Sequence, residues 1–526
     1  MMADSSKRID KFTAISGLVL FLASWFYTTE LHFMLLTAAQ LILVPMTLHL
    51  VMEINKKQAI IIGAGQVSVF LLHVITIHTG QMLLSIIYLL FTLYVALCGL
   101  VRFFRRGFVN WAEISIDIGM MYLFMGGIWF FIHINGINTG FSPMLNWLTA
   151  IHFHYSAFLL PISIGFFGRI HKSALYNVIV PFILAAPMLV AIGITFWPIL
   201  EFIAVIFYIF AIYSLIYLAL KTKFSYFLQG LFIRLSFSAL GITILFSLVY
   251  SVGRAYGKWY VTLDYMLLFH GLVNCIFFGL IGVLGWSLHL PESKQAVWSF
   301  PVSKIRGKLT TDNSYKSGLV DDLSEFAEIK ELPKTIVNFY EQTNKYRLFA
   351  TTYWAAWFKP LLIIYKPVSI WLNQLNLPVS KKRVEMHGQI LGVNPLLDGR
   401  KSPRAWVRDV NGSTIFTAIY SSHENNGTTY MNIALPLPFS TMIGILRLEM
   451  RNKSLVLSSQ GDGDQGIYLA TGKLLFKLPL SEDFLIEEKQ AGELTAIHKM
   501  KLFGLAFLQI NYHIVEKNIP KRKLPI

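Results

Sequence analysis

The chain has 526 residues, of which 55% are hydrophobic and 14% charged, and its mean hydropathy is +0.56. This composition excludes an ordinary soluble protein and predicts a protein that crosses a membrane several times. The net charge of +16 does not point to nucleic acid, because the basic residues of the first half stand in short gaps between apolar runs, where membrane orientation explains them. The two cysteines, Cys98 and Cys275, both lie in apolar runs and support neither a disulfide framework nor a thiolate metal cluster.

Apolar runs long enough to cross a bilayer follow one another as far as about residue 290. They predict about ten membrane helices, at residues 12–27, 31–52, 59–77, 82–101, 112–132, 147–168, 174–195, 198–218, 226–252 and 265–288. Pro198 separates the seventh from the eighth, because proline cannot continue a helix. The N-terminal segment lacks a cleavage site of small residues, so we expect a first membrane helix rather than a removed signal peptide.

Basic residues collect in alternate gaps between these runs. One set of gaps holds Lys7, Arg8, Lys11, Lys56, Lys57, Arg102, Arg105, Arg106, Arg169, Lys172, Lys221 and Lys223, and the opposite set holds only Arg254 and Lys258. Because loops rich in Lys and Arg stay on the cytoplasmic side, we expect both the N-terminus and the chain beyond residue 290 to be cytoplasmic.

Polar residues and turn signals return after residue 290, so the chain divides into a transmembrane helical domain and soluble segments. We expect the transmembrane domain at 1–290, a linker at 291–316, a helical, aromatic, membrane-proximal segment at 317–380 and a cytoplasmic antiparallel β domain at 381–526. Two short helices are predicted at 319–330 and 333–346. The stretch 351–378, rich in Trp and Lys, is expected at the membrane interface or in the soluble core, interrupted by Pro360 and Pro367.

Short runs separated by Asn, Gly, Asp and Ser predict about ten strands from Val384 onward. Examples are residues 405–410, 414–421, 428–435, 441–449, 454–459 and 505–515. Short links without helical spacing predict an antiparallel sheet that is closed into a barrel or folded as a sandwich. Apolar residues occupy both alternations of many strands, which suits a barrel around an apolar ligand and a two-layer core equally well.

Polar residues of the membrane half gather near its predicted outer face: His133, His152, His154, Glu201, Asp264, His270 and Asn274. Ionisable groups at membrane depth are costly and commonly functional, and imidazole with carboxylate is the ligand chemistry of zinc or iron. These residues therefore predict a pocket for a ligand, a divalent metal or a proton path, or histidines that only hydrogen-bond between helices. His152 and His154 differ by about 200° around an ideal helix, so both reach one ion only if the helix is distorted or starts between them.

Glu113 and Asp117 stand one turn apart at the cytoplasmic start of the fifth predicted helix. Carboxylates there complement the helix dipole. A proton relay is the alternative, and deep burial of Asp117 would favour it.

Two stretches of the membrane half are similar to known proteins: WLTAIHFHYSAFLLPISIGFFGR at 147–169, and HGLVN at 270–274 with GVLGW at 282–286. They resemble the YndJ-like family of bacterial multi-pass membrane proteins. The tail is similar to a soluble domain of bacterial proteins, through FYEQTNKY at 339–346, LNQLNLP at 372–378 and its β-rich character. The resemblance implies this architecture and the bacterial cell (inner) membrane, and it carries over no activity and no catalytic residue.

Three classes of function follow, all of them with the lipid bilayer as a partner. The favoured class is a protein that binds a lipid or small hydrophobic ligand. One alternative is an intramembrane metal-dependent hydrolase that uses His152, His154 and His270 with Asp264 or Glu201. The other is a transporter or proton-coupled carrier, for which an internal repeat of broken helices would be expected. The second half has no nucleotide-binding glycine loop and no nucleophile elbow, so enzymatic activity stays an open question.

Overall fold

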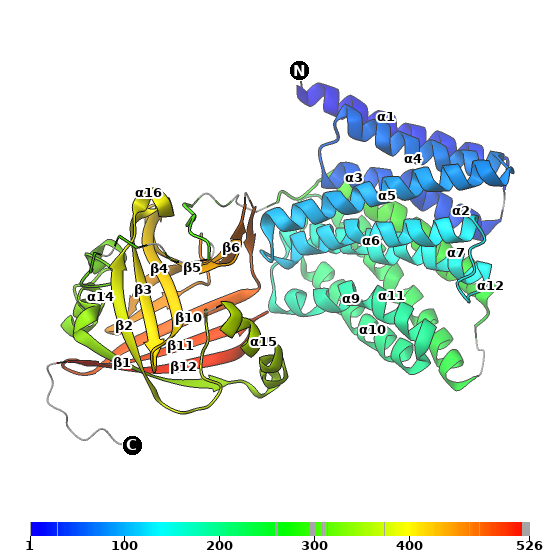
Figure 1. Ribbon diagram of the computed structural model, residues 1–526. Coiled ribbons are helices and arrows are strands. Elements are labelled where there is room, and N and C mark those ends of the chain that lie inside the picture. Colours follow the sequence, from blue (N-terminus) through cyan, green and yellow to red (C-terminus); the bar gives the residue numbers. More distant parts are fainter. Residues whose placement is uncertain are drawn as a thin grey trace. The chain divides into compact units, whose positions relative to one another are not determined.

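A computed structural model describes residues 2–28, 30–257, 261–293, 298, 300–307, 309, 311–312, 314–372, 374–461, 463–472 and 474–517. The chain divides into two compact units, Met1–Phe103 with Val109–Gln295, and Phe104–Phe108 with Ala296–Ile526. The first unit is helical and the second is built around a β-sheet (Figure 1).

Long apolar helices joined by short loops make up the helical unit. In chain order they are α1 (Met2–Ser24), α2 (Leu31–Ala38), η1 (Ala39–Leu43), α3 (Val44–Val51), α4 (Lys56–Val74), α5 (His78–Arg106), α6 (Trp111–Ile134), α7 (Pro143–His152), η2 (Phe153–Leu159), α8 (Leu160–Ile170), α9 (Ala174–Phe196), α10 (Pro198–Lys221), α11 (Phe227–Tyr256), α12 (Leu263–Tyr265), η3 (Met266–Gly271), η4 (Asn274–Ile281) and α13 (Gly282–Leu288). The break between α9 and α10 falls at Trp197, where the backbone is extended, so the predicted split before Pro198 is confirmed.

Among the described residues, nine helices are long and apolar enough to cross a bilayer. They coincide with the second to tenth predicted spans, so the multi-pass architecture is confirmed. The first predicted span, at 12–27, falls in α1, whose apolar stretch Thr13–Ser24 is shorter than the other nine helices. The sequence predicts about ten crossings, and the difference from the nine long apolar helices among the described residues is α1.

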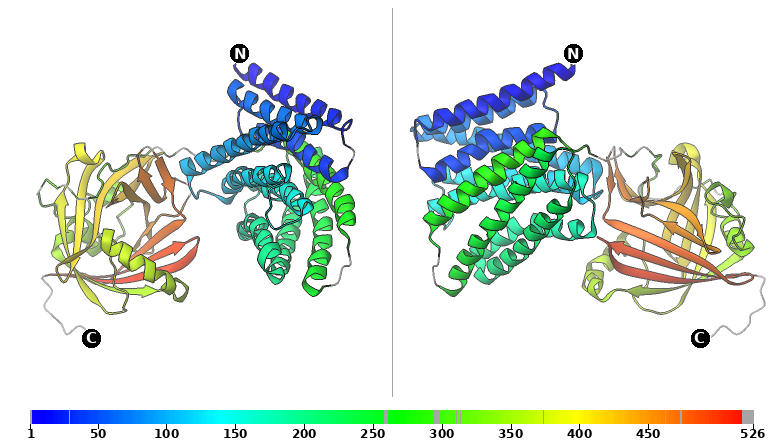
Figure 2. Two further views of the ribbon diagram at one scale, coloured as in Figure 1. Left: turned by 45° about the vertical axis from the view of Figure 1, so that its right-hand side comes forward. Right: turned by 180° about the vertical axis from the view of Figure 1, so that it is seen from behind.

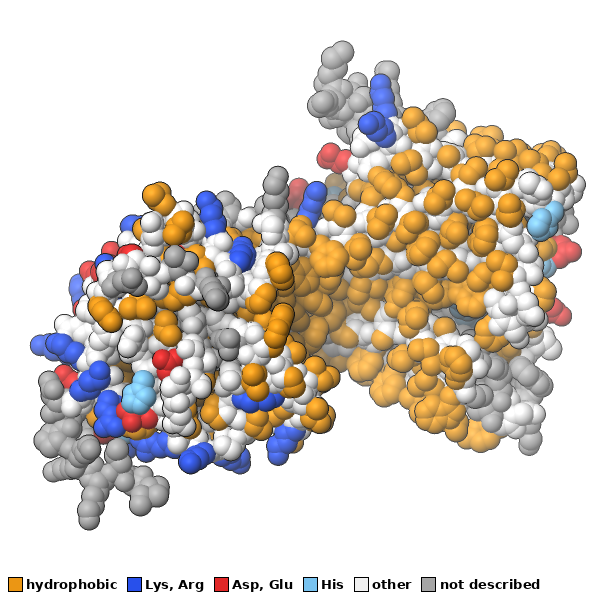
Figure 3. Space-filling view, in the orientation of Figure 1, with side chains coloured by type: hydrophobic (Ala, Val, Ile, Leu, Met, Phe, Trp, Pro, Cys, Tyr) orange, Lys and Arg blue, Asp and Glu red, His pale blue; other side chains and the backbone are white. Residues whose placement is uncertain are grey.

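Two of these helices form the centre of the helical unit. In Leu31–Val51 and Pro143–Ile170, 78% and 83% of the most apolar stretch is buried, against 28% in Lys56–Val74 and in Leu263–Leu288. The outer helices instead expose their hydrophobic side chains, which cover most of the visible surface of this unit (Figure 3). An apolar outer surface is what contact with lipid tails requires.

Four segments of the helical unit are π-helical: η1, η2, η3 and η4. They interrupt the second, sixth and last of the predicted spans, and η1, η2 and η4 contact one another. A π-helical turn is rare and is often found at functional sites. The sequence analysis did not predict these turns, because no hydrophobic period marks a single π-helical turn within a long apolar run.

An antiparallel barrel forms the core of the second unit. Its strands are β1 (Tyr346–Trp354), β2 (Val384–Gly392), β3 (Lys401–Val410), β4 (Ser413–Asn425), β5 (Thr428–Leu437), β6 (Ser440–Arg451), β7 (Ser454–Ser458), β8 (Gly466–Thr471), β9 (Leu474–Lys477), β10 (Leu480–Gln490), β11 (Glu493–Leu502) and β12 (Leu505–Glu516). They follow the order β5-β4-β3-β2-β1-β12-β11-β10-β7-β6, and β5 also pairs with β6, which closes the ring, while β8 and β9 extend from β6. The antiparallel prediction is confirmed, and of its two forms the barrel is correct (Figure 2).

Two local predictions before the barrel were wrong. Residues 319–330 were expected to be a helix, but they contain only the 3-10 turn η5 (Leu323–Glu325). The stretch 351–378, expected at the membrane interface or in the soluble core, begins inside β1, where Thr352 is buried. Pro367 was expected to interrupt the chain, but it lies inside the helix α15 (Lys359–Leu372). The second short helix is present as α14 (Lys334–Glu341), which follows Pro333.

Described residues from the later part of the stretch expected to be a linker, 291–316, pack on the outside of the barrel. Phe300 and Ile305 join a second apolar core with Ile419, Ile443 and Tyr468. These strand residues alternate with the residues that face the barrel interior, so both faces of the sheet are buried here. Burial on both faces explains why β4 and β6 carry apolar residues on both alternations.

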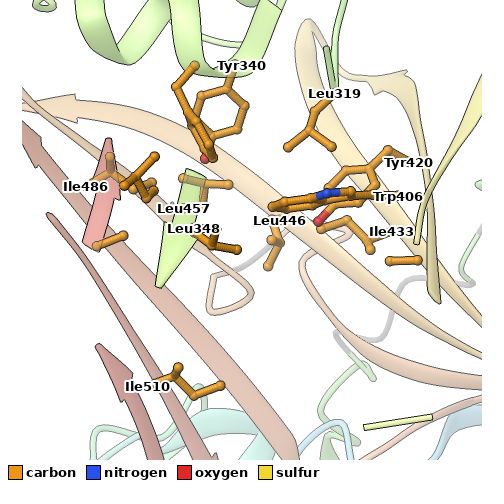
Figure 4. Close-up of a cluster of buried hydrophobic side chains, with 14 of the residues drawn as sticks. Leu319, Tyr340, Leu348, Trp406, Tyr420, Ile433, Leu446, Leu457, Ile486 and Ile510 are labelled. Carbon is orange, nitrogen blue, oxygen red and sulfur yellow. The ribbon is translucent and has the colours of Figure 1, made fainter. Parts of the chain in front are cut away.

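Each end of the barrel is covered by a different element. The segment with Leu319 and α14 covers the end where β1 begins, and Tyr340 of α14 points into the interior (Figure 4). The chain after α15 covers the opposite end, where the side-chain amide of Gln374 donates to the Thr417 and Pro436 carbonyls. The interior is thus closed by α14 at one end and by residues 374–377 beneath α15 at the other.

Candidate functional site

His154 is the most deeply buried of the predicted histidines, at 1% exposure. Its Nδ1 lies 2.8 Å from the Ala150 carbonyl one turn earlier, and its Nε2 lies 2.7 Å from the Tyr88 hydroxyl of α5. Gly126 of α6 leaves room for the ring, because a Cβ there would meet it at 2.8 Å. Both ring nitrogens are therefore occupied by protein partners from the helix bundle.

The other predicted polar residues of the sixth and tenth spans contact different partners. His152 Nδ1 lies 2.7 Å from the Leu148 carbonyl, a partner that His154 does not share. His270 Nδ1 lies 3.1 Å from the Thr243 carbonyl, and the Thr243 hydroxyl donates to Asn274 Oδ1 at 2.9 Å. His270 and Asn274 thus face one helix, α11, as their spacing predicts.

The remaining outer-face candidates are scattered. His133 Nδ1 lies 2.9 Å from the Pro143 carbonyl, Glu201 is buried in the first turn of α10, and Asp264 is exposed in the first turn of α12. Within the part of the chain that the structure describes, no three His, Cys, Asp or Glu side chains are placed to hold a metal ion. These contacts give the hydrolase alternative no support and favour the structural reading, in which the histidines hydrogen-bond locally and between helices.

Glu113 and Asp117 belong to a buried charge cluster. Asp117 Oδ1 accepts from Arg102 Nε at 2.8 Å, and Glu113 accepts from Arg102 at 3.3 Å and from Arg169 Nε at 2.8 Å. The Ser293 hydroxyl also donates to Glu113, at 2.7 Å. Asp117 is as deeply buried as the relay alternative requires, at 1% exposure, but both carboxylates are engaged by arginines that clamp α5, α6 and α8 together.

The barrel encloses an apolar cavity with a volume of about 120 Å³. Alternate residues of the ring strands line it, including Leu348, Trp406, Ile433, Leu446, Ile486 and Ile510 (Figure 4). Tyr340 and Leu319 close it at the α14 end, and Leu375 and Leu377 line it at the α15 end. Period-two alternation in a closed ring of strands points these side chains into the same space.

One side chain in this cavity is cationic. Arg408 is 8% exposed, and its guanidinium carbon lies 4.3 Å from the ring centre of Trp406 and 3.9 Å from that of Phe416. Its Nε is buried and has no hydrogen-bond partner. Among the described residues, no carboxylate lies within the 4 Å of an ion pair with Arg408. An unpaired buried charge is costly unless something else compensates it.

Other polar groups also line the cavity. His498 Nε2 lies 3.0 Å from Glu482 Oε2, and the His498 ring stacks on Phe484 at 3.8 Å. Burial raises the pKa of Tyr420 to about 12, although the positive charge of Arg408 opposes that shift. Burial likewise raises the pKa of Tyr512, so both hydroxyls stay protonated near neutral pH and can donate.

Sequence reasoning proposed an apolar ligand inside the β domain but named none of these polar residues. Trp406 and Arg408 are two residues apart on β3 and so share one face of the strand. The residues of the other face, Ala405 and Val407, are apolar as well. Nothing in the sequence says which alternation faces inward. The alternation that holds Trp406 contains two arginines, Arg404 and Arg408, and nothing local in the sequence marks Arg408 as the one that lines the cavity.

A model of the YndJ-like protein family matches residues 34–278, a range that runs from α2 into η4. A protein of Bacillus subtilis (strain 168), described as uncharacterized membrane protein YndJ, is 39% identical over 461 residues, which cover 83% of this chain and 84% of the relative. Because the helical unit ends at Gln295, an alignment of that length includes much of the barrel unit too. No solved structure matches the chain. The match to the relative spans most of both chains, and the chain belongs to the YndJ-like family of membrane proteins.

Proposed function

We propose that this membrane protein binds a small hydrophobic ligand inside its β-barrel. The observation that carries the proposal is the enclosed cavity of about 120 Å³ lined mainly by aliphatic and aromatic side chains. Apolar cavities of about 150 Å³ in proteins stay free of water and take up small apolar molecules. Eight-stranded and larger barrels that hold one ligand in their interior use the same arrangement.

The short connection between the last membrane helix and the barrel unit supports a ligand that comes from the bilayer. The last long apolar helix ends at Leu288 and the barrel unit starts within the following residues, so the barrel is tethered close to the membrane that holds the helices. The proposed ligand source is therefore the lipid phase, and the proposed partner of the protein is the bilayer itself.

We further propose that the barrel lies in the cytoplasm of a bacterial cell. Lys and Arg occupy the loops after α3, α5, α8 and α10, and the barrel follows the last span on that same side of the alternation. This assignment does not depend on α1. Only the side of the N-terminus changes with whether α1 crosses the membrane, and the predicted cytoplasmic N-terminus requires that it does.

A filled cavity tests ligand binding. Ala496 lines the cavity and is buried, so Ala496→Phe places a ring in the space that a ligand would take. We expect octan-1-ol to raise the melting temperature of the full chain, because a ligand that binds only the folded state stabilises it, and Ala496→Phe to lose that response.

The control enlarges the cavity instead. Leu446→Ala removes a cavity-lining side chain and should lower the melting temperature while keeping the response to octan-1-ol. Far-ultraviolet circular dichroism checks that both variants keep their strands. An equal response in the wild-type chain and Ala496→Phe would place the alcohol elsewhere and end the proposal.

A further inference from the structure

We propose that the ligand of the barrel is an amphiphile with a single anionic head group, such as a fatty carboxylate, and that Arg408 binds this head group. The inference rests on the proposed function, since it names the chemical class of the molecule that the cavity holds. The inference extends the proposed function, because it assigns a charge to the ligand and names the residue that recognises this charge.

The first argument is the unmet charge of Arg408. Its guanidinium lies between the rings of Trp406 and Phe416, at 4.3 Å and 3.9 Å from their centres. Contact with these two rings favours the positive charge but supplies no hydrogen-bond acceptor in the plane of the guanidinium. Its N–H donors point along the edge, in the plane of the group, and the edge nitrogen Nε has no partner although it is buried. A carboxylate in that plane would accept two hydrogen bonds side by side.

The second argument is the set of neutral donors around the same point. The hydroxyls of Tyr420 and Tyr512 lie within the electrostatic reach of Arg408, and both line the cavity. Protonated phenol groups donate hydrogen bonds to an anion and carry no negative charge that would repel it. A head group with several oxygen acceptors would therefore be fully hydrogen-bonded here.

The third argument is that the cavity is itself amphipathic. Arg408 stands near the end of β3 and Glu482 near the start of β10, both at the α15 end of the barrel. Toward the α14 end the lining is apolar, with Leu348, Ile486 and Ile514. A head group held at Arg408 thus sends its chain into the apolar half.

Glu482 is a second charged group of the cavity, and its negative charge opposes the binding of an anion. Its Oε2 lies 3.0 Å from His498 Nε2, so an imidazole and not Arg408 is its immediate partner. If Glu482 rather than Arg408 governed the cavity, the preferred ligand would be a cationic amphiphile. The sign of the ligand charge therefore distinguishes the two arrangements.

The test compares three probes of equal chain length: octanoate, octan-1-ol and octylammonium. Each radiolabelled probe is dialysed to equilibrium against the full chain in lipid nanodiscs, and empty nanodiscs give the partition background. We expect octanoate to bind at least tenfold more tightly than octan-1-ol, because a hydrogen bond to a charged group adds that much, and we expect octylammonium not to bind above background.

Arg408→Gln should reduce octanoate affinity to that of octan-1-ol and leave octan-1-ol binding unchanged, which also proves that the variant is folded. Arg404→Gln supplies the matched control: Arg404 is a second buried arginine on β3, but it is paired with Asp321 and does not line the cavity. Octanoate binding should survive there.

The outcomes separate the two proposals. If octan-1-ol binds and octanoate binds no better, or if Arg408→Gln leaves octanoate binding intact, the anionic head group is refuted and the apolar cavity function stands. Preferred binding of octylammonium refutes it as well. If none of the three probes binds above background, both proposals fail.

Discussion

Lys477 is a cation of the barrel unit whose pKa is strongly lowered. It lies at the end of β9, where Nζ donates to the Gln465 carbonyl at 2.8 Å and stands 4.9 Å from the ring centre of Trp298. Burial lowers the pKa of Lys477 from 10.5 to about 8. A folded-state pKa below the unfolded one means that the unfolded chain binds more protons between these two values, so this residue makes folding more favourable as pH rises from about 8 to 10.5.

Lys477→Met should therefore raise the melting temperature of the barrel unit at pH 7, by about 3 °C. A shift of one pKa unit is worth about 1.4 kcal/mol, and the lost hydrogen bond and ring contact offset part of the gain. The advantage should shrink between pH 8 and pH 10, where the wild-type amine becomes neutral. Tryptophan fluorescence during heating reports the transition.

The exposed Lys499 of β11 supplies the control, as Lys499→Met removes the same charge without the same burial. A pH trend of equal size in both variants would show that total charge, and not the surroundings of Lys477, sets the effect.

At the scale of single elements, α15 differs from the other helices of the barrel unit. Only Leu362 and Ser369 are buried in it, while Ile363 is 78% exposed and Trp371 is 72% exposed. Lys359 and Lys366 flank these apolar residues. A helix with exposed Ile and Trp and basic neighbours is suited to the interface of a bilayer, which is the placement predicted for this stretch from its composition.

We predict that α15 contacts lipid in the native membrane. A nitroxide at Ile364→Cys, with Cys98 and Cys275 replaced by Ser, should be relaxed more by oxygen, which concentrates in lipid, than by a water-soluble nickel chelate in proteoliposomes. Glu424→Cys, at an exposed polar position of β4, should show the opposite preference. The same preference at both positions would mean that α15 faces water.

Strands with a clear alternation of residues and turn residues at both ends were predictable from the sequence, and strands that lie next to other sequence patterns were not. The strands β3 to β7 fell within a few residues of their expected positions because turn residues such as Asn411 and Asn426 punctuate them, and both adopt positive φ as tight turns require. β1 was missed although Tyr346, Leu348, Ala350 and Thr352 alternate correctly and are buried. The aromatic residues that follow it are typical of a segment at the membrane interface and favoured that interpretation over a strand.

The candidate sites show the same limit. The helical positions of His154 and His270 were correctly placed by counting residues, but their partners, Tyr88 and Thr243, come from helices far away in the sequence. Arg408 could be found only after the ring of strands had fixed which alternation faces inward. Hydrogen-bond partners and inward faces are properties of tertiary packing, and a single sequence does not encode them in any local pattern.

At the scale of the whole molecule, the orientation in the membrane is open to direct measurement. With the native cysteines replaced by Ser, Asn138→Cys, in the exposed loop between α6 and α7, should react with a membrane-impermeant maleimide in intact cells. Glu424→Cys in the barrel should react only after the cells are permeabilised, because the barrel follows the last span on the side of the basic loops. The reverse pattern would place the barrel outside the cell.

Closure of the ring has a consequence for how the protein is made. β1 pairs with β2 on one side and with β12 on the other. Residues 346–354 therefore lack hydrogen-bond partners on one edge until residues 505–516 have been made. The ribosome releases β12 after every membrane helix and after the other eleven strands. The cavity therefore forms only after β12 has been made, and a nascent chain that still lacks β12 exposes two unpaired edges to the quality-control machinery of the cell.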